Sequence, residues 1–139
     1  MKIALAIVLG VTSLMADLQR VEHSVVDTTS QLVWQDNVEV EEKTLLFSEA
    51  KEYCQSLTLD KESDWRLPTV YELQSIVDLT QYDPALQRGF HFGRSENYWS
   101  STLYADDKDR AWFINFKSGS VEHSRQSYDF YVRCVRDKK

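Results

Sequence analysis

The sequence predicts an α+β domain in which two amphipathic helices pack on a mostly antiparallel sheet. Strand-like segments stand at both ends of the chain, and two segments with helical spacing of apolar residues lie between them. With only 4 Gly and 2 Pro, the 139 residues contain no repeat and no linker-like tract. A chain of this length has enough residues for one domain with one hydrophobic core.

Two short strands joined by a polar turn are expected near the start of the domain. Val21–Val26 and Leu32–Gln35 are rich in β-branched and aromatic residues, and Asp27–Ser30 between them has the composition of a turn. The acidic segment Glu39–Lys43 follows as a connector. We therefore expect a hairpin that leads into the first helix.

The first helix is predicted over Thr44–Leu59, with Thr44 as its N-cap. Five residues recur at helical spacing and define its buried stripe: Leu46, Ala50, Tyr53, Cys54 and Leu57. Cys54 is therefore expected to face the core.

The second helix is predicted after the loop Asp60–Leu67 and to end near Leu79. Thr69 follows Pro68, and Glu72 stands three residues after Thr69, which is the spacing of a capping box. The apolar stripe of this helix consists of Val70, Leu73, Ile76 and Val77.

The C-terminal third is expected to form most of the sheet. Tyr82–Asn97 has no clear period and is predicted to be a long structured loop. Four strands are predicted after it: Tyr98–Thr102, Ala111–Phe116, Val121–Ser124 and Tyr131–Val135.

Cys54 and Cys134 are the only two cysteines of the chain. A disulfide between them would join the first helix to the last strand, and it would leave neither sulfur free as a nucleophile. In the chain-entropy model, closing a loop of this length is worth roughly 4 to 5 kcal/mol. Two unpaired, buried thiols are the alternative.

The N-terminus has the plan of a secretory signal peptide over residues 1–16. Lys2 precedes the apolar run Ile3–Met15, and Ala16 offers a small residue for cleavage before Asp17. A retained anchor is the alternative, although the run is shorter than the span of about 20 residues that a membrane needs. We expect an exported protein, periplasmic, secreted or at the cell surface, whose mature domain is residues 17–139 and has no transmembrane segment.

The formal net charge of −6 argues against binding to nucleic acid or to anionic membranes. No Gly-rich phosphate loop and no Gly-x-Ser-x-Gly motif is present, so we expect neither enzymatic activity nor a cofactor. His23, His91 and His123 lack the spacing of metal ligands. Asp106, Asp107 and Asp109 are interrupted by cations and predict a solvated hairpin rather than a metal site.

Several strings, taken together, resemble the Lcl C-terminal domain family over Val21–Arg136. They are LVWQ at Leu32–Gln35, DWRLPT at Asp64–Thr69, YWSST at Tyr98–Thr102 and VRCVR at Val132–Arg136. The resemblance implies a compact C-type-lectin-like fold related to sulfatase-modifying-factor domains, with the first-helix cysteine bonded to a cysteine on the last strand. The structural motif residues are Trp34, Trp65, Arg66, Pro68, Glu72, Trp112 and Arg133.

The tryptophans and arginines of these motifs are mainly expected to be structural. Trp34, Trp65, Trp99 and Trp112 are expected in the core, with Trp99 as the best candidate for an exception. Arg66 is expected to pair with Asp64, Glu72 or Asp78 and to hold the second helix. Arg133 and Arg136 are predicted to point to opposite faces, one as a solvent charge and the other in an ion pair.

In a lectin-like fold, loops around the central strands form the recognition face. Three segments qualify here: Leu86–Asn97, Tyr104–Arg110 and Arg125–Tyr131. The candidate ligand-binding residues are Arg88, Phe90, His91, Phe92, Arg94, Trp99 and Tyr104. Ordinary loop packing is the alternative for the first segment.

The expected function is that of an exported, non-catalytic binding module for a glycan or an envelope component. The alternative is a periplasmic domain that acts by protein contact, as an inhibitor or a structural partner. No oligomeric state is predicted.

Overall fold

The computed structural model describes residues 17–139 and confirms the α+β class. The smaller sheet contains β1 (Leu18–Val21), β2 (Ser24–Asp27), β3 (Leu32–Gln35) and β9 (Val135–Asp137), in the order β1-β2-β3-β9. The larger sheet contains β4 (Thr44–Leu45), β8 (Phe130–Tyr131), β5 (Asn97–Leu103), β6 (Arg110–Asn115) and β7 (Ser120–Arg125), in the order β4-β8-β5-β6-β7.

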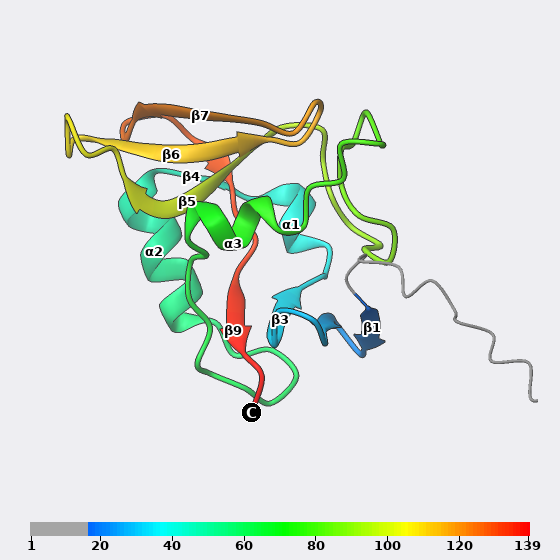
Figure 1. Cartoon of the computed structure of the whole chain (residues 1–139). Coiled ribbons are helices and arrows are strands. Elements are labelled where there is room, and N and C mark those ends of the chain that lie inside the picture. The colour runs from blue at the N-terminus through cyan, green and yellow to red at the C-terminus, as the bar shows by residue number, and fades with distance from the viewer. Residues whose placement is uncertain (1–16) are drawn as a thin grey trace, which may run out of the picture.

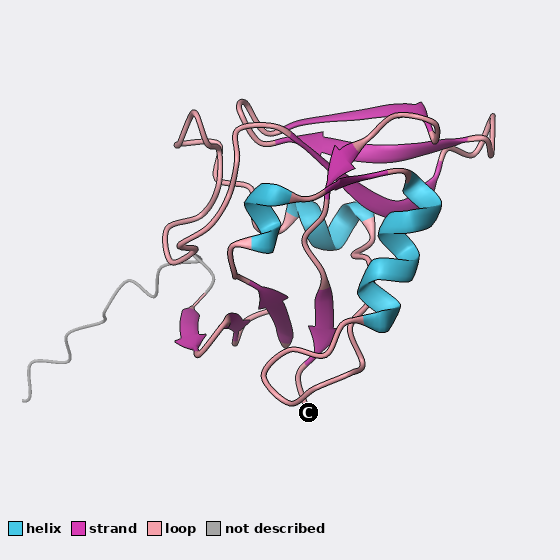
Figure 2. Ribbon diagram, turned by 180° about the vertical axis from the view of Figure 1, so that it is seen from behind, coloured by secondary structure: helices cyan, strands magenta, loops and turns pink. Residues whose placement is uncertain are grey.

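Three helices are found in the described part of the chain: α1 (Glu39–Glu42), α2 (Phe47–Ser56) and α3 (Val70–Gln74). Figures 1 and 2 show the five-stranded sheet at the top, the four-stranded sheet at the bottom and the helices between them. All strand pairs are antiparallel except β5 with β8, which pair in parallel through Tyr98 and Tyr131. The predicted signal peptide lies outside the described residues.

The first predicted strand is in fact part of a hairpin. The chain turns at Glu22, which has a φ of 55°, so that β1 and β2 pair antiparallel with Leu18 opposite Asp27. The β2–β3 hairpin follows as predicted, with Asp27 opposite Leu32.

The first predicted helix begins later than expected, at Phe47. Thr44 is not its N-cap, because Thr44 and Leu45 pair with β8 instead. The N-cap position is Leu46, whose backbone N–H donates to the Glu49 side chain at 2.9 Å. Ala50 and Cys54 are fully buried, as the helical stripe predicts.

The capping box of the second helix is confirmed. The Glu72 N–H donates to the Thr69 hydroxyl at 3.1 Å, and the Thr69 N–H donates to the Glu72 carboxylate at 2.9 Å. The helix α3 ends at Gln74 and not near Leu79, because Val77 leaves the helix to form a β-bridge with Leu86. Ile76 nevertheless remains fully buried.

The segment predicted as the last strand, Tyr131–Val135, instead connects two strands, β8 and β9, which belong to different sheets. Cys134 lies in the connection between β8 and β9, and its N–H donates to the Gln35 side chain at 3.0 Å. The disulfide between Cys54 and Cys134 is present and excludes the alternative of two free thiols. It therefore joins α2 to the residue before β9 rather than to the strand itself.

The larger sheet separates two core clusters. Alternation along β6 sends Ile114 into a cluster with Trp34 and Leu73, and Phe113 into a cluster with Trp99 and Cys54. None of the helices among residues 17–139 has the length and apolar character that crossing a membrane requires.

Candidate functional site

The Leu86–Asn97 loop is bound to the rest of the domain through two carboxylates, the buried Asp36 and the partly exposed Glu41. Asp36 is fully buried and accepts hydrogen bonds from the backbone N–H groups of His91 (2.9 Å) and Phe92 (3.1 Å). The side chain of Glu41 accepts the next one, from Gly93, at 2.9 Å. The loop backbone is thus fixed to α1 and to the segment that follows β3.

Arg133 fills the space behind this loop. Its guanidinium is 2% exposed and donates to Asp36 (3.1 Å), to the Gln35 carbonyl (2.6 Å) and to the Phe92 carbonyl. The Phe90 ring covers it, with the centroid 4.6 Å from the guanidinium carbon. These contacts favour the packing alternative for this loop, and Phe90 and Phe92 are partly buried against the core.

The remaining candidates of this loop lie on the surface. Arg88 and His91 are exposed, and Arg94 is exposed while its Nε donates to the Glu41 carbonyl at 2.8 Å. The space between Leu86, Gly93, Tyr98 and the side chains of Arg94 and Arg133 leaves no room for a ligand.

Trp99 is not the exception among the tryptophans, because it is fully buried. Its indole N–H donates to the Leu45 carbonyl at 2.9 Å, so no polar group of this side chain faces solvent. Trp34 and Trp65 are also buried, as predicted. The partly exposed tryptophan is Trp112.

The motif arginines are both paired, which corrects the expectation of one solvent charge. Arg133 pairs with Asp36, and Arg136, only 7% exposed, pairs with Asp64 (2.8 Å) and Glu62 (3.4 Å). Arg133 lies in the buried connection before β9, whereas Arg136 belongs to β9 and is covered by its partners in the Asp60–Leu67 loop.

Arg66 pairs with Glu72, as predicted, through two hydrogen bonds of 2.6 and 2.8 Å. A third bond, to Asp137 at 3.0 Å, joins the start of α3 to β9. Pro68 is buried beside this pair and accepts the N–H of Ser101 at 2.7 Å.

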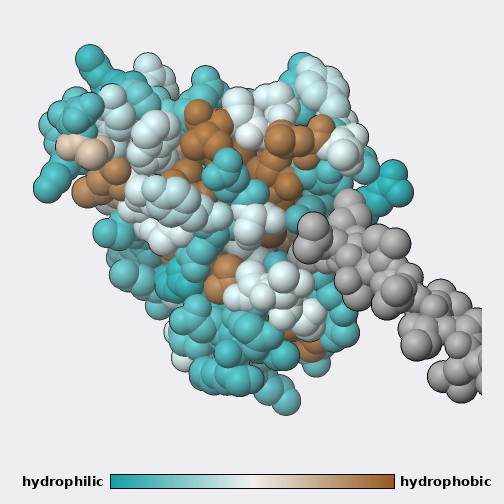
Figure 3. Space-filling view, viewed as in Figure 1, coloured by the Kyte–Doolittle hydropathy of each residue, from teal (hydrophilic) through white to brown (hydrophobic). Residues whose placement is uncertain are grey.

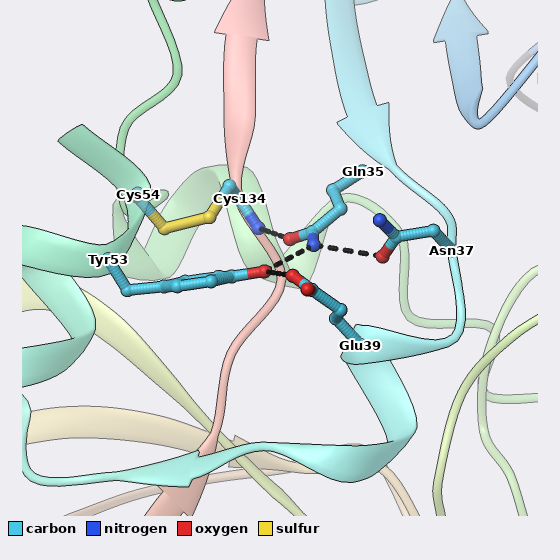
Figure 4. The surroundings of a disulfide bond; sticks show 6 residues. All are labelled: Gln35, Asn37, Glu39, Tyr53, Cys54 and Cys134. Atoms are coloured by element: carbon cyan, nitrogen blue, oxygen red, sulfur yellow. Dashed lines mark hydrogen bonds between the residues drawn. A yellow bond between two sulfur atoms is a disulfide. The ribbon is translucent and has the colours of Figure 1, made fainter. Parts of the chain in front are cut away.

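The surroundings of the disulfide are a closed polar network (Figure 4). The side-chain N–H₂ of Gln35 donates to the Tyr53 hydroxyl (2.9 Å) and to Asn37 (3.0 Å), and the Tyr53 hydroxyl donates to Glu39. Burial, together with the bond to Glu39, raises the pKa of Tyr53, so this hydroxyl stays protonated and structural.

Folding lowers the pKa of several carboxyl groups, among them the buried Asp36 and the partly buried Glu72. Burial alone would raise the pKa of Asp36, but Arg133, Arg20 and two backbone N–H groups outweigh it. Burial likewise opposes ionisation of Glu72, and the hydrogen bonds from Arg66 and Thr69 outweigh it, so its pKa is also below the ordinary value.

Acidification should therefore destabilise the domain. A carboxyl whose pKa is lowered by folding stabilises fully above its unfolded pKa, about 4, and loses this contribution as the pH falls through the folded pKa. We expect the free energy of unfolding in urea to fall progressively below about pH 4. Over the same pH interval, the variant Asp36→Asn should lose less free energy of unfolding than the wild type. Equal losses in the two proteins would contradict the lowered pKa of Asp36 as a cause of the acid sensitivity.

The other two candidate loops converge at one end of the larger sheet (left in Figure 1). The Gln126 N–H donates to the Asp109 carbonyl at 3.1 Å, and its side chain donates to the Lys108 carbonyl at 2.9 Å. Between the loops lies an open hollow of about 460 Å³, lined by Asp107, Asp109, Arg125, Gln126 and Ser127. These side chains offer both donors and acceptors to a polyhydroxylated ligand.

A cluster of half-buried aromatic rings lies on the strands and the loop that lead to this hollow. Tyr104 stacks on His123 with ring centroids 3.8 Å apart and an interplanar angle of 9°. Trp112 meets His123 edge to face at 5.0 Å and Tyr104 at 5.5 Å. Trp112 and His123 are directly opposite each other on β6 and β7.

Arg110 completes this cluster. Its Nε donates to Nδ1 of His123 at 2.9 Å, and its Nη2 donates to the His123 carbonyl at 3.3 Å. The Arg110 guanidinium forms no ion pair with any residue of the described range 17–139. Strand alternation places Arg110 and Trp112 on one face of β6, and His123 and Arg125 on the matching face of β7.

Sequence reasoning found Tyr104 but missed His123 and Arg110 as parts of one cluster. The signal lay in the hairpin register, because the turn after Phe116 sets Trp112 opposite His123 and Arg110 opposite Arg125. The aspartates of the 104–110 loop are exposed, and the part of the chain that the structure describes contains no group of three or more His, Cys, Asp or Glu arranged to hold a metal.

A second hollow, of about 250 Å³, lies between the smaller sheet and the Asp60–Trp65 loop. Its charged lining is largely neutralised within the protein: Glu62 pairs with Arg136 and Lys139, and Asp60 accepts the N–H of His23 at 3.1 Å. It therefore offers fewer free polar groups than the end of the larger sheet.

Comparison with known proteins gives one match. A family model described as the Lcl C-terminal domain covers residues 23–136, which include every element from β2 to most of β9. No curated protein matches the chain.

Proposed function

The chain belongs to the Lcl C-terminal domain family, and from that premise we propose that it is a non-catalytic binding module for a glycan or another polyhydroxylated component of the cell envelope. The binding surface is the end of the larger sheet: the aromatic cluster of Tyr104, Trp112 and His123, with Arg110 and the hollow between the two loops. We call this the sheet-end surface.

One observation carries the proposal: half-buried aromatic rings lie on β6, β7 and the 104–110 loop, and residues of the same loop and of the end of β7 line a polar hollow of about 460 Å³. A sugar ring has an apolar C–H face and hydroxyl edges. Aromatic rings suit the face, while carboxylates, amides and hydroxyls suit the edges. The Tyr104–His123 stack holds two of the rings in place before any ligand arrives, which reduces the entropic cost of binding.

The fold and the compartment form part of the same proposal. We propose a C-type-lectin-like domain, supported by the disulfide from the longest helix, α2, to the residue before β9. Export is supported by that disulfide, since such bonds persist in oxidising compartments, and by the signal-peptide pattern of residues 1–16.

Replacing Tyr104 by alanine should weaken glycan binding about tenfold, because loss of a stacked aromatic ring removes roughly 1.4 kcal/mol. A glycan array with the wild-type domain selects the probe, and calorimetry then compares Tyr104→Ala with Tyr71→Ala, which removes an exposed tyrosine on α3. Equal affinities of the two variants would contradict the proposed surface, and so would an array that is blank at micromolar protein.

A second candidate function, protein contact, is favoured by exposed apolar residues on another face. Figure 3 shows apolar residues gathered over α3 and the nearby strands. Leu79 is 80% exposed and packs near Gly119, close to the partly exposed Val121. A Leu79→Ser variant that loses a pulled-down envelope protein while keeping glycan binding would support this second function.

A further inference from the structure

The two ring nitrogens of His123 have different surroundings. Nδ1 lies 2.9 Å from Nε of Arg110. A guanidinium can only donate, so Nδ1 is the acceptor of this hydrogen bond and the hydrogen of the neutral ring is on Nε2. The second bond, from Arg110 to the His123 carbonyl at 3.3 Å, and the stacked Tyr104 ring fix the imidazole in this orientation.

The N–H groups of the His123 and Trp112 rings have no hydrogen-bond partner among residues 17–139. Within residues 17–139, Trp34 Nε1 is the one buried side-chain nitrogen or oxygen that lacks a hydrogen-bond partner. Neither Nε2 of His123 nor Nε1 of Trp112 has a partner among the described residues, so both are accessible to solvent. The rings that carry them are 5.0 Å apart at a cross-strand pair.

The charge next to these donors is positive. The Arg110 side chain is half-buried and has no carboxylate partner among residues 17–139, so an anion bound beside it would gain from the reduced hydration of the guanidinium. The two adjoining loops carry four carboxylates, Asp106, Asp107, Asp109 and Asp129, against the three cations Lys108, Arg110 and Arg125. Their formal charge is therefore 3 − 4 = −1, and the positive charge is local to Arg110.

Resting on the proposed function, we infer that Arg110 is a positioning residue that fixes the Nε2–H form of His123, and that the N–H groups of His123 and Trp112 bind the carboxylate of an acidic sugar. A carboxylate has only acceptors and carries two oxygens in one plane, which suits two neighbouring donors beside a cation. The hydroxyls of the same saccharide then contact the polar side chains of the hollow.

The tautomer is testable without any ligand. Long-range ¹H–¹⁵N spectra at pH 7.5 should show His123 as the Nε2–H form alone, whereas the exposed His23 serves as an internal reference for an imidazole that no side chain fixes. Arg110→Gln should return His123 to a mixture of tautomers, and Lys117→Gln, in the turn at the opposite end of the hairpin, should leave it unchanged. A mixture in the wild type, or the Nδ1–H form, would overturn the positioning role.

The carboxylate is tested with three probes: a galacturonate trisaccharide, its methyl ester and a galactose trisaccharide that carries one sulfate on each residue. The acid should bind at least tenfold more tightly than the ester, and Arg110→Gln should remove that difference while Lys117→Gln keeps it. Equal binding of acid and ester, or no binding of either, would overturn the carboxylate assignment. If the sulfated probe bound as tightly as the acid, the site would recognise negative charge alone, and this result would also overturn the carboxylate assignment.

The outcome for the proposed function is read separately. If Tyr104→Ala weakens binding of the array-selected glycan while the acid and its ester bind equally, the glycan-binding surface stands and the carboxylate site does not. If Tyr104→Ala leaves glycan binding unchanged and the acid and its ester also bind equally, the proposed binding surface itself is overturned.

Discussion

Replacing Arg133 by methionine should lower the free energy of unfolding by about 3 to 5 kcal/mol, the range found when one partner of a buried ion pair is removed. Arg133 is 2% exposed and Asp36 is fully buried, so the substitution leaves a buried carboxylate without its buried cation. It also leaves the carbonyls of Gln35 and Phe92 without their donor. Urea unfolding followed by tryptophan fluorescence measures the loss.

The matched control is Arg88→Met, which changes an exposed arginine of the loop that Arg133 supports. It should alter the stability by less than about 0.5 kcal/mol. The double variant Arg133→Met/Asp36→Asn should lose less than the sum of its single variants, because the unpaired charge is gone. An Arg133→Met domain within about 1 kcal/mol of the wild type would contradict the structural role of this pair.

The second large effect concerns the disulfide. Cys54 and Cys134 are 80 residues apart, so replacing both by alanine should lower the free energy of unfolding by about 4.5 kcal/mol in the chain-entropy model. The wild type unfolded in the presence of a reductant should lose a similar amount, while the alanine variant should be insensitive to the reductant. A reductant effect of equal size in the alanine variant would show that the bond is not its cause.

Short-range patterns were sufficient for the features that depend on neighbours in the sequence. The capping box of Thr69 and Glu72 spans one helical turn, and the buried position of Cys54 follows from the apolar stripe of the first helix. Such features need no knowledge of the rest of the fold. The predicted pairing of the two cysteines was likewise confirmed.

The arginines show where local rules fail. Asp36 is 97 residues from Arg133, and Asp64 is 72 residues from Arg136. The period of two correctly separates neighbouring side chains, but it does not say whether either side is open to solvent. Here Arg133 is buried where the chain passes between the two sheets, and Arg136 on β9 is covered by Glu62 and Asp64.

The prediction of which tryptophan is exposed on the larger sheet was wrong for the same reason. Alternation and pairing set Trp99 opposite Phe113 and Trp112 opposite His123. The rings of Phe47 on α2 and Phe130 on β8 pack against Trp99, and the position of Phe130 depends on the parallel pairing of β8 with β5, which no local pattern predicts. The sheet-end surface could therefore be recognised only when the hairpin register was known.

The location of binding is tested most directly by amide chemical-shift mapping during a titration with the galacturonate trisaccharide. We expect the shifted backbone signals to fall in Tyr104–Arg110, at Trp112 and in His123–Ser127, with those of Gly89–Arg94 unchanged, because that loop is closed by Asp36 and Arg133. Shifts concentrated in Gly89–Arg94 would instead place the ligand on the filled loop and contradict the sheet-end surface.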